Sequence, residues 1–133
     1  MTTGRIVTYT TAGRPALLNA ERSAHWRDHR GTTRANRTEA GLRLLAEGRK
    51  GVMPMVKIDV WSLYDNRLLP DTGACLPTVK AIIDGAVDAG LLPHDGPAVV
   101  KHLAFWSPTT DKETGNQLLV SFQELEEGSP WLL

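Results

Sequence analysis

The segment from Pro77 to Ala89 constrains the fold more than any other part of this sequence. Proline suits the first turn of a helix, and Gly90 follows directly as a stop signal. The apolar residues between them recur with the period of an α-helix, and they are Val79, Ile82, Ile83, Ala86 and Val87. Because segments with β-like alternation lie on both sides, this helix can carry the chain from one strand to a parallel neighbour in the same sheet.

Four segments are predicted as strands, because β-branched and apolar residues alternate in them with polar ones. They are Arg5 to Thr11, Met55 to Tyr64, Ala98 to Trp106 and Gln117 to Leu125. The last two are expected to pair as a hairpin across the loop between them. A second helix is predicted from Thr38 to Gly48, starting as early as Thr33, because leucines lie along one side of it.

The resulting order, β-α-β-α-β-β, predicts an α+β fold in which a mixed β-sheet carries two packed α-helices. A chain of 133 residues can bury a sizeable core, and residues 1–133 show no repeat or linker, so one domain is expected. No stretch is long and apolar enough to span a bilayer. The single cysteine, Cys75, cannot form an intramolecular disulfide, and the first residues do not resemble a signal peptide, so we expect a cytoplasmic protein.

The charges are unevenly distributed although the formal net charge is zero. Residues 1–50 hold ten basic side chains against four acidic ones, and residues 51–133 hold five against eleven. A protein that performs metal-assisted chemistry on a polyanion needs a basic region for phosphates and an acidic region for a cation. Two ordinary solvated faces explain the same distribution.

The basic region centres on a segment from Gly13 to Thr33, which is predicted to be a functional loop. Basic and aromatic side chains of this kind contact phosphates and stack on unpaired bases. A segment without fixed structure is the alternative. The candidate DNA-binding residues are Arg14, Asn19, Arg22, His25, Arg27 and Arg30.

The strong helix also presents charges. Lys80, Asp84 and Asp88 recur every four residues and therefore share one stripe, which by itself indicates no more than a solvated helix face. Asp71 precedes the helix and Asp95 follows it, each in a turn where aspartate is common. Together, these acids and the lysine suggest a site, because Mg²⁺ is bound by a few carboxylates with water and phosphate oxygens. Cys75 is expected to pack in the core, and His102 to occupy an exposed strand position.

The stretch PDTGACLPTVKAIIDGAVDAGLLPHDGPAVV resembles the core signature of the RusA-type Holliday-junction resolvases. In that family a pair of metal-binding aspartates precedes a helix with a lysine, an aspartate follows four residues later, and an acidic pair stands near fifteen residues after the lysine. Lys80, Asp84 and Asp95 have these separations. The likeness extends to the segment from Pro15 to Asn19, the strand entry Pro54 to Ile58, and the last strand, so it covers nearly the whole chain.

The sequence departs from the family pattern at three positions. Leu76 stands where the second aspartate is usual, Pro77 replaces the following asparagine, and His94 replaces the first acid of the closing pair. The resemblance implies an endodeoxyribonuclease that resolves four-way DNA junctions, with Mg²⁺, or alternatively Mn²⁺, as cofactor. It implies Asp71 and Asp95 as metal ligands, and His94 can add a nitrogen ligand.

The resemblance also implies roles for the remaining site residues. Lys80 would neutralise charge on the phosphate, and Asp84 would either orient Lys80 or complete the ligand set. A homodimer is implied, since two opposed strands must be cut, and the aromatic residues Trp26, Trp61 and Trp106 are candidates for its surface. The alternatives are a catalytically weak DNA-binding member that has lost a carboxylate, and a protein-interaction domain whose acidic half recruits a partner.

Overall fold

The computed structural model describes residues 4–12, 26–66 and 68–130, with side chains for all of these except residues 12 and 26–31. The elements in chain order are β1 (Ile6–Ala12), α2 (Trp26–Lys50), β2 (Val56–Tyr64), α3 (Leu76–Asp88), β3 (Val100–Phe105), β4 (Thr109–Thr110) and β5 (Gln117–Glu124). This confirms the predicted α+β fold, a mixed sheet with two helices, and adds the two-residue strand β4.

The sheet has the strand order β1-β5-β2-β3, and β4 continues beside the end of β2. β5 runs antiparallel to both β1 and β2, whereas β3 and β4 run parallel to β2. The parallel connection from β2 through α3 to β3 is the one predicted from the sequence. The expected hairpin is wrong: β3 and β5 lie on opposite sides of β2, because the α3 crossover places β3 on one edge of β2 and leaves the other edge to β5.

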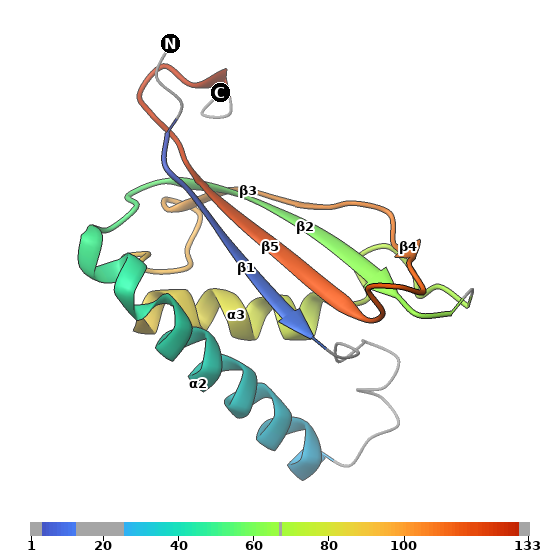
Figure 1. Cartoon of the computed structure of the whole chain (residues 1–133). Helices are drawn as coiled ribbons and strands as arrows, with labels where there is room; N and C mark the ends of the chain where they lie inside the picture. Colours follow the sequence, from blue (N-terminus) through green and yellow to red (C-terminus); the bar gives the residue numbers. More distant parts are fainter. Residues whose placement is uncertain (1–3, 13–25, 67, 131–133) are drawn as a thin grey trace.

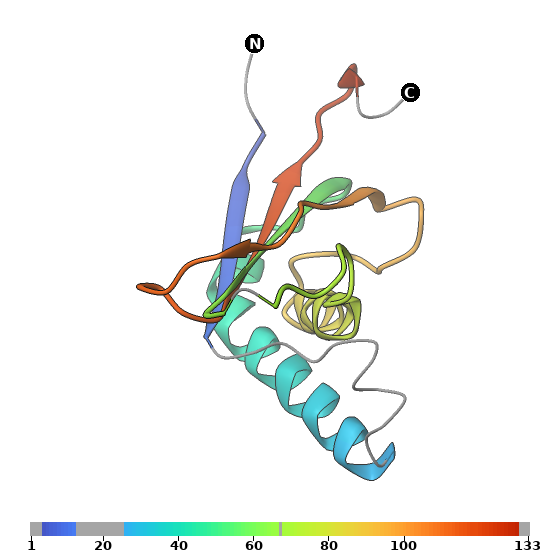
Figure 2. The same cartoon turned by 90° about the vertical axis from the view of Figure 1, so that its right-hand side faces the viewer.

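Both helices lie on the same face of the sheet, as the two perpendicular views show (Figures 1 and 2). The core forms between this face and the helices, where alternate residues of the central strands meet the apolar side of α3. Its fully buried members include Val56, Ile58, Val60, Val79, Ile82, Ala86, Leu118, Val120 and Phe122. Among the described residues, no helix covers the opposite face of the sheet (Figures 1 and 2).

The helix α2 is longer than the sequence predicts. It begins at Trp26 and not between Thr33 and Thr38, so the second half of the predicted loop is helical. This part of the helix was not predicted because its sequence has no apolar periodicity. In agreement with this, residues 32–35 are all exposed. In Figure 1 the N-terminal half of α2 extends beyond α3 and the sheet, where no core requires apolar side chains. None of the helices described here has an apolar stretch long enough for a membrane span.

Candidate functional site

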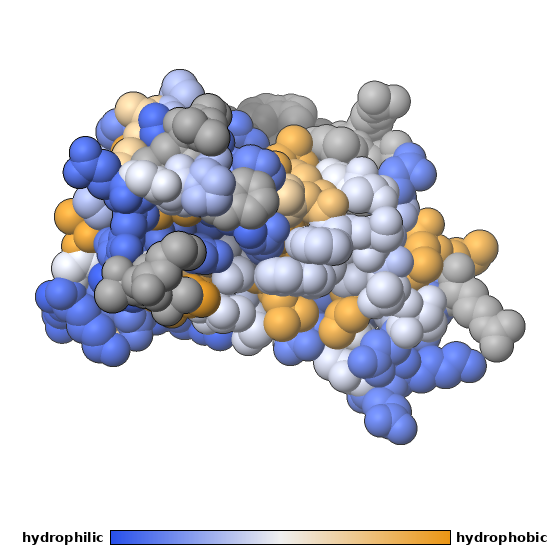
Figure 3. All heavy atoms as spheres, turned by 90° about the horizontal axis from the view of Figure 1, so that it is seen from above, coloured by the Kyte–Doolittle hydropathy of each residue, from blue (hydrophilic) through white to orange (hydrophobic). Residues whose placement is uncertain are grey.

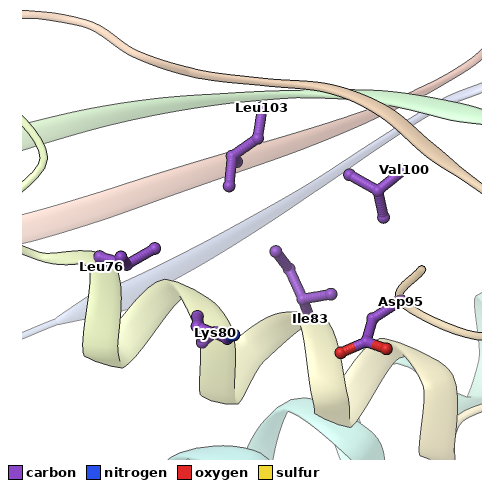
Figure 4. Close-up of a pocket in the computed structure, with 6 residues that line it drawn as sticks. All are labelled: Leu76, Lys80, Ile83, Asp95, Val100 and Leu103. Carbon is purple, nitrogen blue, oxygen red and sulfur yellow. The ribbon is translucent and has the colours of Figure 1, made fainter. Parts of the chain in front are cut away.

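A pocket of about 200 Å³ lies between α3 and the edge strand β3. Figure 4 shows the six residues that line it: Leu76, Lys80 and Ile83 from α3, Val100 and Leu103 from β3, and Asp95 from the turn between them. Lys80 and Asp95, two of the predicted site residues, therefore share one pocket although they are fifteen residues apart. Both side chains are exposed, so water and solutes can reach them.

The chain returns to this pocket by a sequence of local contacts. After α3 ends, Gly90 takes a positive φ of 79°, and the backbone N–H groups of Leu91 and Leu92 donate to the carbonyl of Ala86. Burial of these two leucines holds the connection against the core. The following turn closes when the N–H groups of residues 99 and 100 donate to the Gly96 carbonyl, which sets Asp95 just ahead of β3.

Asp84 lies one helical turn after Lys80, close enough to both Lys80 and Asp95 for electrostatic interaction. Partial burial raises the pKa of the Asp84 carboxyl, and the negative charge of Asp95 raises it further. The cations Arg37 and Lys80 act in the opposite direction. The site thus contains two neighbouring carboxylates, Asp84 and Asp95, together with one lysine.

Asp88, the third residue of the predicted stripe, has a separate role. Its carboxylate accepts two hydrogen bonds from Arg37 of α2, at 2.7 Å from Nε and 2.9 Å from the guanidinium nitrogen Nη2. This bidentate ion pair lowers the pKa of Asp88 and raises that of Arg37. The simple reading of the stripe as a solvated helix face is therefore incomplete, because its last member ties α3 to α2.

Arg37 was not among the site residues predicted from the sequence. It is paired with Asp88 and lies within electrostatic range of Asp84 and Asp95, so it adds a second cation beside the acids of the site. The only sequence signal is its place among the basic residues of the first fifty. Its partner is 51 residues away along the chain, and no spacing rule connects the two.

Asp71 does not line the pocket. It lies in the exposed loop before α3, where its backbone carbonyl accepts a hydrogen bond from the N–H of Ala74 at 2.9 Å. This position is five residues ahead of Leu76, whereas Asp95 lies beyond Ile83 along the helix in Figure 4. The structure therefore brings Asp95 and Lys80 together but leaves Asp71 outside the pocket.

His94 is exposed and engaged in its own turn. Its Nδ1 accepts a hydrogen bond from the backbone N–H of Gly96 at 3.0 Å, which leaves only Nε2 for another partner. Of the candidate DNA-binding residues, Arg14, Asn19, Arg22 and His25 lie outside the described residues. Arg27 and Arg30 lie in the first turns of α2, and their side chains are not described.

The described part of the chain contains no group of three or more histidine, cysteine or carboxylate side chains placed to hold a metal ion. The larger ligand set that the resemblance implies is thus not assembled. Mg²⁺ can also bind through one or two carboxylates and complete its shell with water and phosphate oxygens. Asp84 and Asp95 are the carboxylates of the site that lie within electrostatic range of each other.

Comparison of the sequence with models of known protein families gave no match, and comparison with curated proteins gave none either.

Proposed function

We propose that this protein is a structure-specific endonuclease of the RusA type, which resolves four-way junctions in DNA recombination and repair. The observation that supports this best is the common pocket of Lys80 and Asp95, with Asp84 beside them. These are the three residues whose spacing resembles the family signature.

The proposed chemistry is hydrolysis of a phosphodiester bond. The Lys80 ammonium group lies on the pocket wall and is exposed, so a DNA phosphate can approach it. There it offsets the negative charge that grows on the phosphate oxygens as water attacks phosphorus and the ester oxygen leaves. Electrostatic stabilisation of this kind commonly contributes a factor of about a hundred or more to the rate.

Mg²⁺ is part of the proposal, with Asp84 and Asp95 as the residues that would hold it. A bound divalent ion would polarise a phosphoryl oxygen and lower the pKa of a coordinated water. Partial burial raises the pKa of Asp84 and the negative charge of Asp95 raises it further, and a bound cation would offset this second contribution. For Asp71 and His94, a role as metal ligands is supported by the family resemblance alone.

The DNA itself is proposed to bind along the protruding half of α2 and the basic segment before it. Arg27 and Arg30 lie in this half of the helix, and phosphate contacts by basic residues supply most non-specific affinity for DNA. We further propose a homodimer, so that two active sites meet the two opposed strands of a junction. A cytoplasmic location agrees with the free, buried thiol of Cys75.

The test is cleavage of a synthetic four-way junction in Mg²⁺ by purified variants. Asp95→Asn keeps the size of the side chain but removes its charge, so cleavage should fall by about a hundredfold or more while junction binding persists. Lys80→Ala should impair cutting similarly with only a modest loss of affinity. Arg27→Glu with Arg30→Glu should weaken binding in a salt-dependent manner.

Glu113→Gln is the matched control for Asp95→Asn, because Glu113 is an exposed acid in the loop before β5, away from the pocket residues. It should cut like the parent protein. If Asp95→Asn also cuts a junction as fast as the parent in Mg²⁺, the proposed site is wrong.

A second candidate function is DNA binding without catalysis. The observation that favours it is the absence, among the described residues, of a three-ligand metal group. Calorimetric titration with Mg²⁺ or Mn²⁺ distinguishes the two functions. The nuclease should bind the metal saturably and lose this binding in Asp95→Asn, whereas the binding protein should show no saturable heat.

A further inference from the structure

The walls of the pocket are mostly aliphatic, and phosphate chemistry does not account for them. Four of the six lining residues are Leu76, Ile83, Val100 and Leu103. A phosphate group is strongly hydrated, and moving it against aliphatic side chains costs free energy without compensation. Lys80 and Asp95 can act on a phosphodiester group. The four aliphatic residues would instead contact a ligand group with an apolar surface.

This apolar wall is open because of its place in the fold. β3 is the edge strand of the sheet, and in Figure 4 its side chains Val100 and Leu103 point toward α3 across the pocket. Leu103 is still 36% exposed, whereas Ile83 on the helix is only 6% exposed and forms the floor. The fold therefore leaves an aliphatic slot beside the charged pair of the site.

We propose that this pocket accepts one unstacked nucleobase of the DNA, next to the phosphate that Lys80 contacts. The proposal rests on the proposed function, which supplies DNA as the ligand. The size agrees, since a cavity of about 150 Å³ lined by apolar side chains binds benzene, and this pocket measures about 200 Å³. A base fits between apolar side chains by its flat faces and offers hydrogen-bonding groups along its edge.

The charged pair selects a nucleotide over an aliphatic side chain of a protein partner. An aliphatic group would cover Lys80 and Asp95 without giving either a hydrogen-bond partner, which is unfavourable. A nucleotide offers a phosphate to the Lys80 ammonium. It also offers an amino group on the base, whose hydrogen bond one oxygen of the Asp95 carboxylate can accept while the other oxygen stays available to the proposed Mg²⁺.

Such a pocket would help the protein to select branched DNA over continuous duplex DNA. Removing a base from a regular duplex costs a few kcal/mol in lost stacking and pairing, and the cost is smallest where pairing is already interrupted. Bases at the centre of a junction meet this condition better than bases within a continuous duplex. The pocket would then favour cleavage near the branch point without contacts to a long sequence.

The experiment follows the methyl groups of the pocket by NMR in the intact protein. Deoxyadenosine 5′-monophosphate should shift the methyl signals of Ile83, Val100 and Leu103 saturably, at millimolar concentration. Deoxyribose 5-phosphate, which lacks the base, should leave these methyl signals in place. Equal shifts with both compounds, or no shift with the nucleotide, would overturn the proposal. So would shifts caused only by a leucine amide, which would make the pocket a protein-docking site.

Leu103→Ala tests the wall directly, because a side chain this exposed can be shortened without loss of the fold. Nucleotide affinity should fall about fivefold. The matched control is Leu42→Ala on α2, where a 70% exposed leucine lies outside the pocket, and affinity should not change. Junction cleavage is measured separately: cutting without nucleotide binding would refute the pocket alone, and nucleotide binding without cutting would refute the nuclease alone.

Discussion

At the scale of single residues, the acids of α3 divide into two kinds. Asp84 and Asp88 are one turn apart on the same stripe, yet their carboxyl pKa values move in opposite directions. Burial dominates for Asp84 and raises its pKa, whereas the hydrogen bonds from Arg37 dominate for Asp88 and lower it. Equal spacing in the sequence therefore hides two different environments.

We expect Asp88→Asn and Asp84→Asn to affect stability differently. The lowered pKa of Asp88 means that its ionised form stabilises the fold above the carboxyl's unfolded pKa, and this contribution is lost as pH falls through the folded pKa. Asp88→Asn should thus lower the free energy of unfolding at neutral pH. The loss should stay below about 1 kcal/mol, because the pair is about half exposed, and should shrink at high salt.

The raised pKa of Asp84 has the reverse consequence. Its contribution favours the fold below the unfolded pKa and is lost as pH rises through the folded pKa, so the ionised carboxylate is a cost at neutral pH. Asp84→Asn should therefore leave stability unchanged or raise it slightly. Urea unfolding of both variants at neutral and acidic pH is the measurement. An equal loss in both at neutral pH would show that the environments do not differ as described.

At the scale of elements, the contact between α2 and α3 depends on small residues. A Cβ atom added at Gly85 of α3 would lie 2.6 Å from both the Ala40 Cβ and the Arg37 carbonyl oxygen of α2. At Gly41 of α2, an added Cβ would meet the Asp88 Cβ and the Gly85 carbonyl oxygen at an ordinary 3.6 Å. The helices thus approach closely at Gly85, and the same approach lets Arg37 reach Asp88.

Alanine at these two glycines should give contrasting results. Gly85→Ala forces the helices apart and should destabilise the protein by about 1–3 kcal/mol, despite the gain in helix propensity. Gly41→Ala has the same propensity gain and no clash, so it should be neutral or stabilising by up to about 1 kcal/mol. Thermal or urea unfolding measures both. Equal stability of the two variants would contradict the close approach of the helices at Gly85.

Elements with an apolar face were predictable from the sequence, and α2 shows where this fails. The helix from Pro77 and the strand ending at Tyr64 each bury one side, so their periodicity gives their type and nearly their bounds. In the first half of α2, residues 32–35 are all exposed, and the sequence there shows no apolar periodicity. Apolar periodicity in a sequence reflects the burial of one face of an element. A helix segment that extends beyond the core therefore cannot be predicted from it.

At the scale of the whole molecule, the site combines predictable and unpredictable parts. The spacing of Lys80, Asp84 and Asp95 was recognisable from the sequence. Val100 and Leu103 enter the pocket only because the α3 crossover places β3 over the helix, and this depends on tertiary packing. The same packing explains why Asp71 lies outside the pocket. The chain returns to the pocket only after α3, whereas Asp71 precedes this helix.

The face of the sheet opposite the described helices carries a pair of stacked aromatic side chains. Trp61 and Trp106 stack there with ring centroids 6.1 Å apart and planes only 7° from parallel. Asp59 accepts a hydrogen bond from the Trp106 indole at 3.3 Å and pairs with Lys57 at 2.9 Å. The pair is nearly buried, with side chains 11% and 16% exposed. Figure 3 looks onto this face and shows apolar patches among polar ones.

We expect this face to be where the proposed homodimer forms. Lys57 and Asp59 pair with each other, and the exposed apolar residues Ile6, Trp61 and Trp106 are available to pack against a second copy related by a twofold axis. An interface of typical size removes about 800 Å² from each partner, which one sheet face can supply. Trp26, the third predicted aromatic, begins α2, and its side chain is not described.

Light scattering at micromolar concentration should give the mass of a dimer for the parent protein. Trp61→Lys with Trp106→Lys removes the stacked indoles and adds like charges across the twofold axis, so this variant should be monomeric. Leu42→Lys changes an exposed apolar residue on α2 and should remain dimeric. A monomeric parent would refute the dimer itself. If the double variant stays dimeric, the interface must lie on another surface. The indole pair would then serve packing within one copy.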